Sequence, residues 1–206
     1  MLPFKSLTAI AVPLIRDNID TDAIIPSREM QSVSKTGLAG GLFAGWRYRP
    51  VGSREPNPDF ILNDPRFAPA KILLSGGNFG CGSSREHAAW ALAEYGFRAV
   101  VAASFNPIFR SNCVNNGIVP VELERDAITA IAASLGDRPD SRPVTVDLEA
   151  CSVSTASGSR WTFGIDAEAR QMLLGGMDAI ELTFMRQENI AEMRAADRNE
   201  RPWIYL

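Results

Sequence analysis

A glycine-rich run between a predicted strand and a predicted helix is the feature that most constrains this chain of 206 residues. The run reads Gly76-Gly-Asn-Phe-Gly-Cys-Gly-Ser-Ser-Arg-Glu-His87 and follows a short apolar segment at residues 71–74. Residues 85–95 then have helical character and stop at Gly96, a residue typical of helix C-caps. Because a helix start presents unpaired N–H groups and the positive end of its dipole, this arrangement predicts an anion site.

This run is partly similar to two nucleotide-binding motifs, but it matches neither of them fully. Gly77 and Gly82 have the spacing of a P-loop, but Ser83 stands where the phosphate-binding lysine belongs. The dinucleotide fingerprint lacks its third glycine, since Arg85 stands there, and the next predicted strand ends without an acidic residue for a ribose. Nucleotide phosphates are therefore disfavoured as the anion.

The run instead supplies two serine hydroxyls and a guanidinium. Arg85 can hold a carboxylate through two parallel hydrogen bonds, and a serine beside it at a helix start is favoured as an alkoxide. This combination suits proton abstraction next to a carboxylate. Ser83-x-x-Glu86 is also a capping box, which requires no catalysis. We interpret His87 and Cys81 as packing residues.

A second polar cluster, Asp17-Asn-Ile-Asp-Thr-Asp22, brings three carboxylates into six residues. It lacks the glycine and the distal glutamate of a calcium-binding loop. One interpretation is a turn capped by an aspartate side chain. The other is that one aspartate joins the serine site from a neighbouring loop.

Composition excludes several classes of function. The chain has 21 basic and 24 acidic side chains, a net charge of −3, so it has no basic excess for a nucleic-acid backbone. One histidine and three widely spaced cysteines disfavour a multi-histidine metal site, a disulfide framework and a four-thiolate site. The apolar run at residues 7–15 is too short to span a bilayer, and we expect a cytoplasmic protein.

The order of predicted elements indicates an α/β fold with some parallel strand pairing. Pro120 places its strand at a sheet edge, and five prolines within residues 50–69 predict a long loop. We expect one domain over residues 1–206. Strands are predicted at residues 7–15 (one strand or two short ones), 71–74, 98–103, 118–123, 143–148, 151–155 and 160–165. Helices are predicted at residues 85–95, 106–116, 127–135, 167–174 and 188–197.

Taken together, these motifs resemble the small-subunit family of 3-isopropylmalate dehydratase, within the aconitase superfamily. The resemblance is carried by Asp17-Asn-Ile-Asp-Thr-Asp-Ala-Ile-Ile-Pro26, Gly77-Asn-Phe-Gly-Cys-Gly-Ser-Ser-Arg-Glu-His-Ala88, Ala103-Ser-Phe105 with Ile108-Phe109, Pro56-Asn-Pro-Asp-Phe60 and Leu174-Gly-Gly-Met-Asp-Ala-Ile-Glu-Leu-Thr183. It implies a three-layer β/β/α swivelling domain. It also implies interconversion of 2-isopropylmalate and 3-isopropylmalate through isopropylmaleate, a step of leucine biosynthesis. A separate large subunit would carry a [4Fe-4S] cluster, and this chain alone would bind no cofactor.

The resemblance also implies roles by motif position. Ser83 matches the base at carbon, and Ser84 and Arg85 match residues that bind the substrate carboxylate. Asp22 matches an aspartate that sits in the site as a hydrogen-bonding partner. Lys35, in Lys35-Thr-Gly-Leu-Ala39, stands where bacterial relatives commonly have an arginine, and we expect it to bind substrate.

Two alternatives stay open. Because lysine does not replace arginine neutrally, small subunits of related hydro-lyases that act on homoaconitate, methylmalate or dimethylmaleate are alternatives. A non-catalytic anion-binding module would use the same helix start without needing Ser83. The expected partners are the large subunit and a small dicarboxylic hydroxy acid, with no nucleic acid and no membrane.

Overall fold

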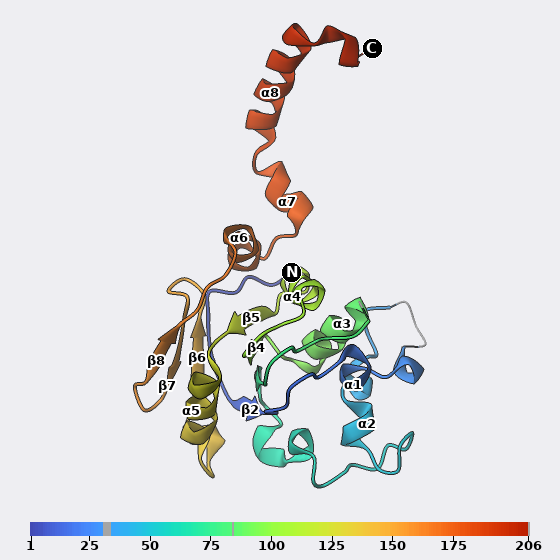
Figure 1. Cartoon of the computed structure of the whole chain (residues 1–206), viewed down its shortest axis with the longest axis vertical. Helices are drawn as coiled ribbons and strands as arrows, with labels where there is room; N and C mark the ends of the chain where they lie inside the picture. The colour runs from blue at the N-terminus through green and yellow to red at the C-terminus, as the bar shows by residue number, and fades with distance from the viewer. Residues whose placement is uncertain (31–33, 84, 206) are drawn as a thin grey trace.

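Two four-stranded sheets form the centre of the computed structural model, which describes residues 1–30, 34–83 and 85–205 (Figure 1). The antiparallel sheet has the order β1 (Ser6–Ala9), β6 (Val144–Asp147), β7 (Ser152–Thr155) and β8 (Arg160–Thr162). The parallel sheet has the order β2 (Ala11–Pro13), β3 (Ile72–Leu74), β4 (Ala99–Ala102) and β5 (Val119–Glu122). Segment 6–13 therefore gives one short strand to each sheet, which confirms the two-strand form of the prediction.

Helices connect and cover these sheets. They are α1 (Thr21–Ile24), α2 (Ala44–Arg47), α3 (Glu86–Tyr95), α4 (Pro107–Asn115), α5 (Arg125–Leu135), α6 (Ala167–Gly175), α7 (Ala179–Phe184) and α8 (Gln187–Glu200). The proline-rich segment 50–69 contains only turns, a bridge and the 3-10 turns η3 (Ile61–Asn63) and η4 (Pro65–Phe67) among its described elements. None of the helices in the described residues has both the length and the apolar character needed to cross a membrane.

Alternate residues of the parallel strands enter two separate cores, because successive side chains of a strand point to opposite faces. Leu73 and Val100 join a core with α3 and α4. Their neighbours Ile72 and Val101 join a second core with α5 and the antiparallel sheet. A parallel sheet buried on both faces explains why β3 and β4 are apolar throughout. The resulting sheet, sheet and helix layers are the predicted β/β/α arrangement.

Most of the predicted elements are confirmed, and the short helices α1, α2 and α7 were not among the predicted ones. α3 ends at Gly96, whose φ of 114° and N–H bonds to the carbonyls of Leu92 and Ala93 close the helix. β5 lies at an edge of its sheet, as Pro120 predicted. Residues 179–184 form α7, which the sequence did not lead us to expect. Its N-terminus is closed by reciprocal hydrogen bonds between Asp178 and Glu181.

Candidate functional site

Two loops that follow neighbouring parallel strands lie against each other and make the candidate site. The aspartate loop is residues 16–22, after β2, and the glycine loop is residues 75–85, after β3. Backbone hydrogen bonds of 2.8–2.9 Å join them, from Asn18 N–H to the Gly77 carbonyl, from Gly80 N–H to Ile19 and from Thr21 N–H to Cys81. The pairing of β2 with β3 therefore continues past the ends of both strands.

Thr21 fixes the backbone at the predicted base. Its side chain is buried, and its Oγ1 donates a 2.8 Å hydrogen bond to the carbonyl oxygen of Ser83. The neighbouring Asp20 accepts the N–H of Ala23 at 2.6 Å and caps α1. The aspartate-capped turn is therefore present, and the adjacent threonine, not an aspartate, makes this bond to the glycine loop.

Asp22 and Arg85 meet across the two loops. Arg85 Nη1 donates to Asp22 Oδ1 at 2.5 Å, and the two side chains are 23% and 56% exposed. A pair this exposed contributes little to stability, so its effect is mainly on orientation. This ion pair uses only Nη1 of the guanidinium. The other N–H groups of Arg85 can therefore bind a carboxylate.

Ser83 is exposed at the end of the glycine loop, and the capping-box interpretation is wrong. α3 begins at Glu86 with Arg85 as its N-cap residue, so Ser83 lies outside the helix start. The carboxylate of Glu86 instead accepts the indole N–H of Trp90 at 3.2 Å. Among the described residues, the Ser83 hydroxyl has no hydrogen-bond partner. The predicted residue Ser84 lies outside the described residues.

Lys35 lies beside Trp90 of α3, which comes five residues after Arg85. Its Nζ sits 5.1 Å from the centroid of the Trp90 ring, and the side chain is exposed. The ring of His87 also packs against Trp90, with 4.6 Å between the two ring centroids. The structure therefore groups Lys35 with Trp90 and His87, while Asp22 and Arg85 form their own pair.

Glu94 anchors the segment that follows Lys35, and no sequence motif pointed to this residue. Its carboxylate accepts three backbone N–H groups at 2.5–2.8 Å, from Gly37, Leu38 and Ala39. Burial acts to raise the pKa of Glu94, but these three hydrogen bonds outweigh it and hold the pKa below its usual range. The anchor fixes the chain beside Lys35 against α3.

Asp17 links the glycine loop to α5. Its Oδ1 accepts Arg125 Nη2 at 2.7 Å and the N–H of Gly77 at 2.6 Å. The hydrogen bond from Arg125, followed by that from Gly77, lowers the pKa of Asp17. Because the folded-state pKa is lowered, the stabilisation is present above the ordinary pKa and is lost as the pH falls through the lowered value. Arg125 is 108 residues away in sequence, so no local motif predicts this bond.

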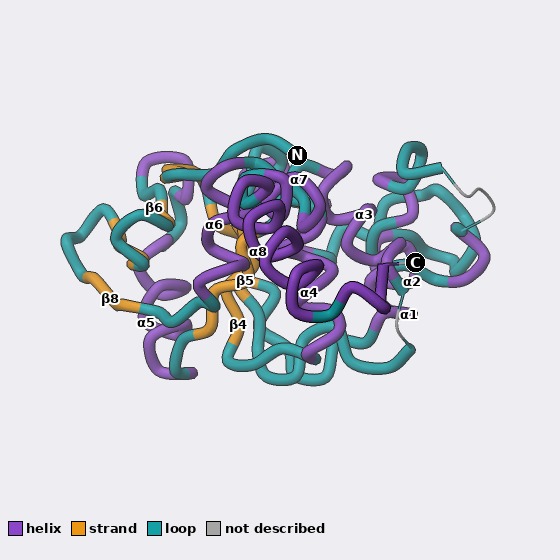
Figure 2. Tube along the Cα trace, turned by 90° about the horizontal axis from the view of Figure 1, so that it is seen from above, coloured by secondary structure: helices purple, strands orange, loops and turns teal. Residues whose placement is uncertain are grey.

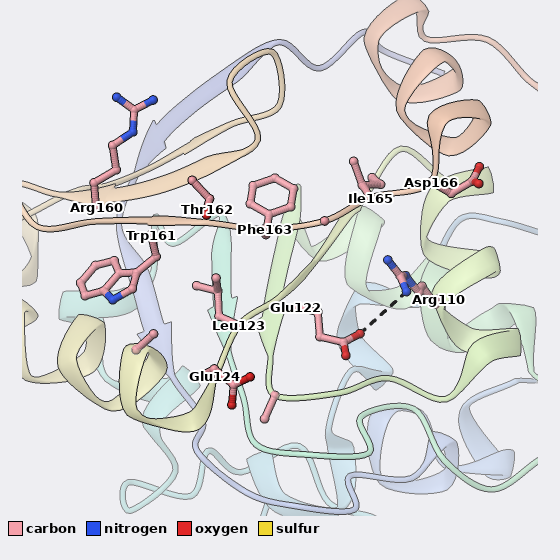
Figure 3. A pocket seen from close by; sticks show the side chains of 13 residues that line it. Arg110, Glu122, Leu123, Glu124, Arg160, Trp161, Thr162, Phe163, Ile165 and Asp166 are labelled. Carbon is pink, nitrogen blue, oxygen red and sulfur yellow. Dashed lines mark ion pairs between the residues drawn. The ribbon is translucent and has the colours of Figure 1, made fainter.

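A cleft of about 830 Å³ lies elsewhere, between the ends of β5 and β8 (Figure 3). Arg110 and Glu122 form an ion pair of 3.8 Å inside it, and Trp161 and Phe163 contribute to its wall. None of the predicted site residues lines this cleft. In the candidate site, Asp22 and Ser83 are exposed on their two loops, an arrangement that a second chain can cover.

The cysteines of this chain do not fit an iron–sulfur cluster. Cys113 is buried in the core beside α3, and burial raises the pKa of its thiol. Cys81 lies in the glycine loop and Cys151 follows β6. Within residues 1–30, 34–83 and 85–205, no group of three or more His, Cys, Asp or Glu side chains is placed to hold a metal ion.

Comparisons with known proteins agree with this architecture. The family model of the aconitase C-terminal domain matches residues 1–126. A 3-isopropylmalate dehydratase small subunit from Cupriavidus necator is 53% identical over 206 residues, which cover 100% of this chain and 99% of that protein. The small subunit from Nitrosomonas eutropha is 42% identical over 221 residues and covers 100% of both chains.

A solved structure shares the fold. The crystal structure of 3-isopropylmalate dehydratase from Methanocaldococcus jannaschii superposes with a TM-score of 0.64 and covers 92% of this chain and 99% of its own. Its sequence identity is 24%, so this likeness concerns the fold alone.

Gly80 gives a test of how tightly the glycine loop is held. Its φ is 74°, and a Cβ there would lie 2.1 Å from the Phe109 ring, whereas Gly96 has a φ of 114° and nothing within 4 Å. We expect Gly96→Ala to lower the free energy of unfolding by about 1–2 kcal/mol through backbone strain. Gly80→Ala should lower the free energy of unfolding by about 1–3 kcal/mol more than Gly96→Ala, because the added methyl group overpacks against Phe109. Urea unfolding measures both, and equal losses would contradict a role for the Phe109 contact.

Proposed function

The chain belongs to the family of 3-isopropylmalate dehydratase small subunits, and on that premise we propose that it supplies the proton-transferring and carboxylate-binding half of the active site. It is the small subunit of a hydro-lyase that interconverts 2-isopropylmalate and 3-isopropylmalate through isopropylmaleate in leucine biosynthesis. The observation that carries the proposal is the convergence of Asp22 and Arg85 beside Ser83 from two loops held together by backbone hydrogen bonds. Identity of 53% over the full chain supports it.

Arg85 binds a carboxylate of the substrate. Its Nη1 is engaged by Asp22, which fixes the plane of the guanidinium, and the remaining N–H groups match the two oxygens of a carboxylate. Ser84 shares this role by its motif position. A substrate held at its carboxylate presents the adjacent carbon at a defined distance from the neighbouring residues.

Ser83 takes the proton from the substrate carbon during dehydration and returns it during hydration. A serine hydroxyl is a weak base, so it acts as an alkoxide, which the positive charge of Arg85, two residues further along the chain, favours. The bond from Thr21 to the Ser83 carbonyl holds the backbone in place while the proton moves. Loss and return of the hydroxyl group belong to the half of the site that the large subunit contributes.

The large subunit completes the site and carries the [4Fe-4S] cluster. The open surface around Ser83 and Arg85 supports this division, and so does a donor set that does not fit a cluster in this chain. Residues 1–206 act as one swivel-type domain in the cytoplasm.

Lys35 supports a second candidate substrate class. Its contact with Trp90 places a compact ammonium where an arginine would offer a planar fork. The methylmalate and dimethylmaleate types of substrate differ from isopropylmalate mainly by an alkyl group, worth about 1–3 kcal/mol in a pocket. Hydration of dimethylmaleate faster than isopropylmaleate by the assembled enzyme would favour this alternative.

Ser83→Ala tests the catalytic role. We expect the mixture of this chain with its cluster-loaded large subunit to hydrate isopropylmaleate, and each chain alone to be inactive. Removal of the base should lower kcat by about 10²–10⁴-fold without loss of the complex. Ser157→Ala, in the exposed β7–β8 turn, is the matched control and should keep full activity.

Two results would contradict this role. Full activity of the Ser83→Ala complex would leave only an anion-binding module. Turnover by the purified chain without any large subunit would remove the two-subunit mechanism.

Thr21→Val tests whether the buried hydroxyl positions Ser83. Valine keeps the shape but leaves the Ser83 carbonyl without its donor, so the free energy of unfolding should fall by about 1 kcal/mol. In the assembled enzyme we expect kcat to fall about tenfold or more with little change in KM, since a small displacement of a catalytic group is costly. Thr21→Ser restores the hydroxyl and should rescue kcat. Equal kcat values for valine and serine would show that the hydroxyl has no positioning role.

A further inference from the structure

The C-terminal part of the chain projects from the body as an arm. We define the arm as residues 179–205, which contain α7, α8 and the 3-10 turn η6 (Pro202–Tyr205). Figure 1 shows it extending from α6 away from both sheets, and Figure 2 looks down on it from its free end. Among the described residues, α8 and η6 have no buried side chain.

The base of the arm is held firmly. The amino group of Met1 donates to the carbonyl of Gly176 at 2.9 Å, and Phe4 N–H donates to the Leu173 carbonyl at 2.8 Å. Leu182 of α7 is 8% exposed and belongs to the core between the sheets. The direction in which the arm leaves the body is therefore set by folded contacts.

Exposed apolar side chains are concentrated on this arm. Most of the large apolar side chains that the described residues expose belong to it, although it is a small part of the chain. Their exposed fractions reach 64% for Phe184, 71% for Met185, 74% for Met193 and 66% for Trp203. Apolar surface gathered in this way marks an interaction site in a folded protein.

α8 also lacks the packing that stabilises a helix of its length. It has 14 residues, and isolated helices of about 12–15 residues are marginal in water. Its last turn is held locally, because the carboxylate of Asp197 accepts hydrogen bonds from Arg201 and Tyr205. The rest of α8 needs a second surface to remain helical.

We propose that the arm docks on the large subunit and lays the apolar side chains of α7 and α8 into an apolar groove there. This rests on the proposed function. The relatives named as small subunits match this chain over its full length, arm included, so the arm is shared by chains whose names imply a large partner. Its length matches the roughly 20–30 residues that one side of a standard interface uses. Phenylalanine, methionine and tryptophan are the residue types enriched at interface centres.

The test is the affinity of the purified chain for its purified large subunit, measured by calorimetry. Phe184→Ser combined with Met185→Ser removes two exposed side chains without disturbing either core. We expect the Kd to rise about tenfold per residue, as for anchor residues of an interface. Leu2→Ser, an equally exposed apolar residue near the base of the arm, is the matched control and should leave the Kd unchanged. Amides of α8 should gain protection from hydrogen exchange only in the complex.

Other results would overturn the proposal. An unchanged Kd for the double variant, or α8 amides equally protected in the free chain, would contradict docking of the arm. An isolated chain that sediments as a dimer, and as a monomer after the double substitution, would assign the arm to a second copy instead. Isopropylmaleate hydration is measured on the same samples. If the complex is active and the double variant has an unchanged Kd, only the arm proposal is contradicted. If binding depends on the arm but the complex does not hydrate isopropylmaleate, only the proposed function is contradicted.

Discussion

Backbone pairing that continues beyond the carboxyl ends of the parallel strands is the interaction on which the rest of the structure depends. It joins the aspartate loop to the glycine loop, and it extends to the next strand, where Phe79 N–H donates to the Ser104 carbonyl at 3.0 Å and Asn106 N–H to the Phe79 carbonyl at 2.9 Å. Ligands of open α/β sheets bind at such strand ends. The glycines allow the close approach, and the side chains of Thr21 and Asp22 then reach Ser83 and Arg85 across a fixed distance.

The elements that sequence could predict are those with a local cause. Gly96 ends α3, Pro120 marks an edge strand, and the serine-loop residues identified the family, because each signal lies within a few residues of the structure it determines. The bond from Thr21 to Ser83 and the bond from Arg125 to Asp17 have no such signal. They depend on which strand ends become neighbours in the sheet, and that is a property of the whole chain. α7 was missed because its capping residues resemble a turn when burial is not known.

A partner chain explains both the exposed site and the apolar arm. The loops bring together the residues that we propose as base and carboxylate binder, Ser83 and Asp22 are exposed there, and among the described residues no group of side chains is placed to hold a metal ion. A second chain is needed to exclude water and to complete the chemistry. The arm, fixed at its base and exposed at Phe184 and Met185, provides a place where such a chain can be held while the loops remain accessible to substrate.

The most direct measurement is a double-mutant cycle in the assembled enzyme, with Asp22→Asn, Arg85→Lys and the double variant compared by kcat/KM for isopropylmaleate hydration. If Asp22 acts by orienting the guanidinium of Arg85, the two losses are strongly coupled, and the double variant is no slower than the slower single variant. Losses that simply add would show that Arg85 binds substrate without help from Asp22. That result would contradict a site built from two joined loops.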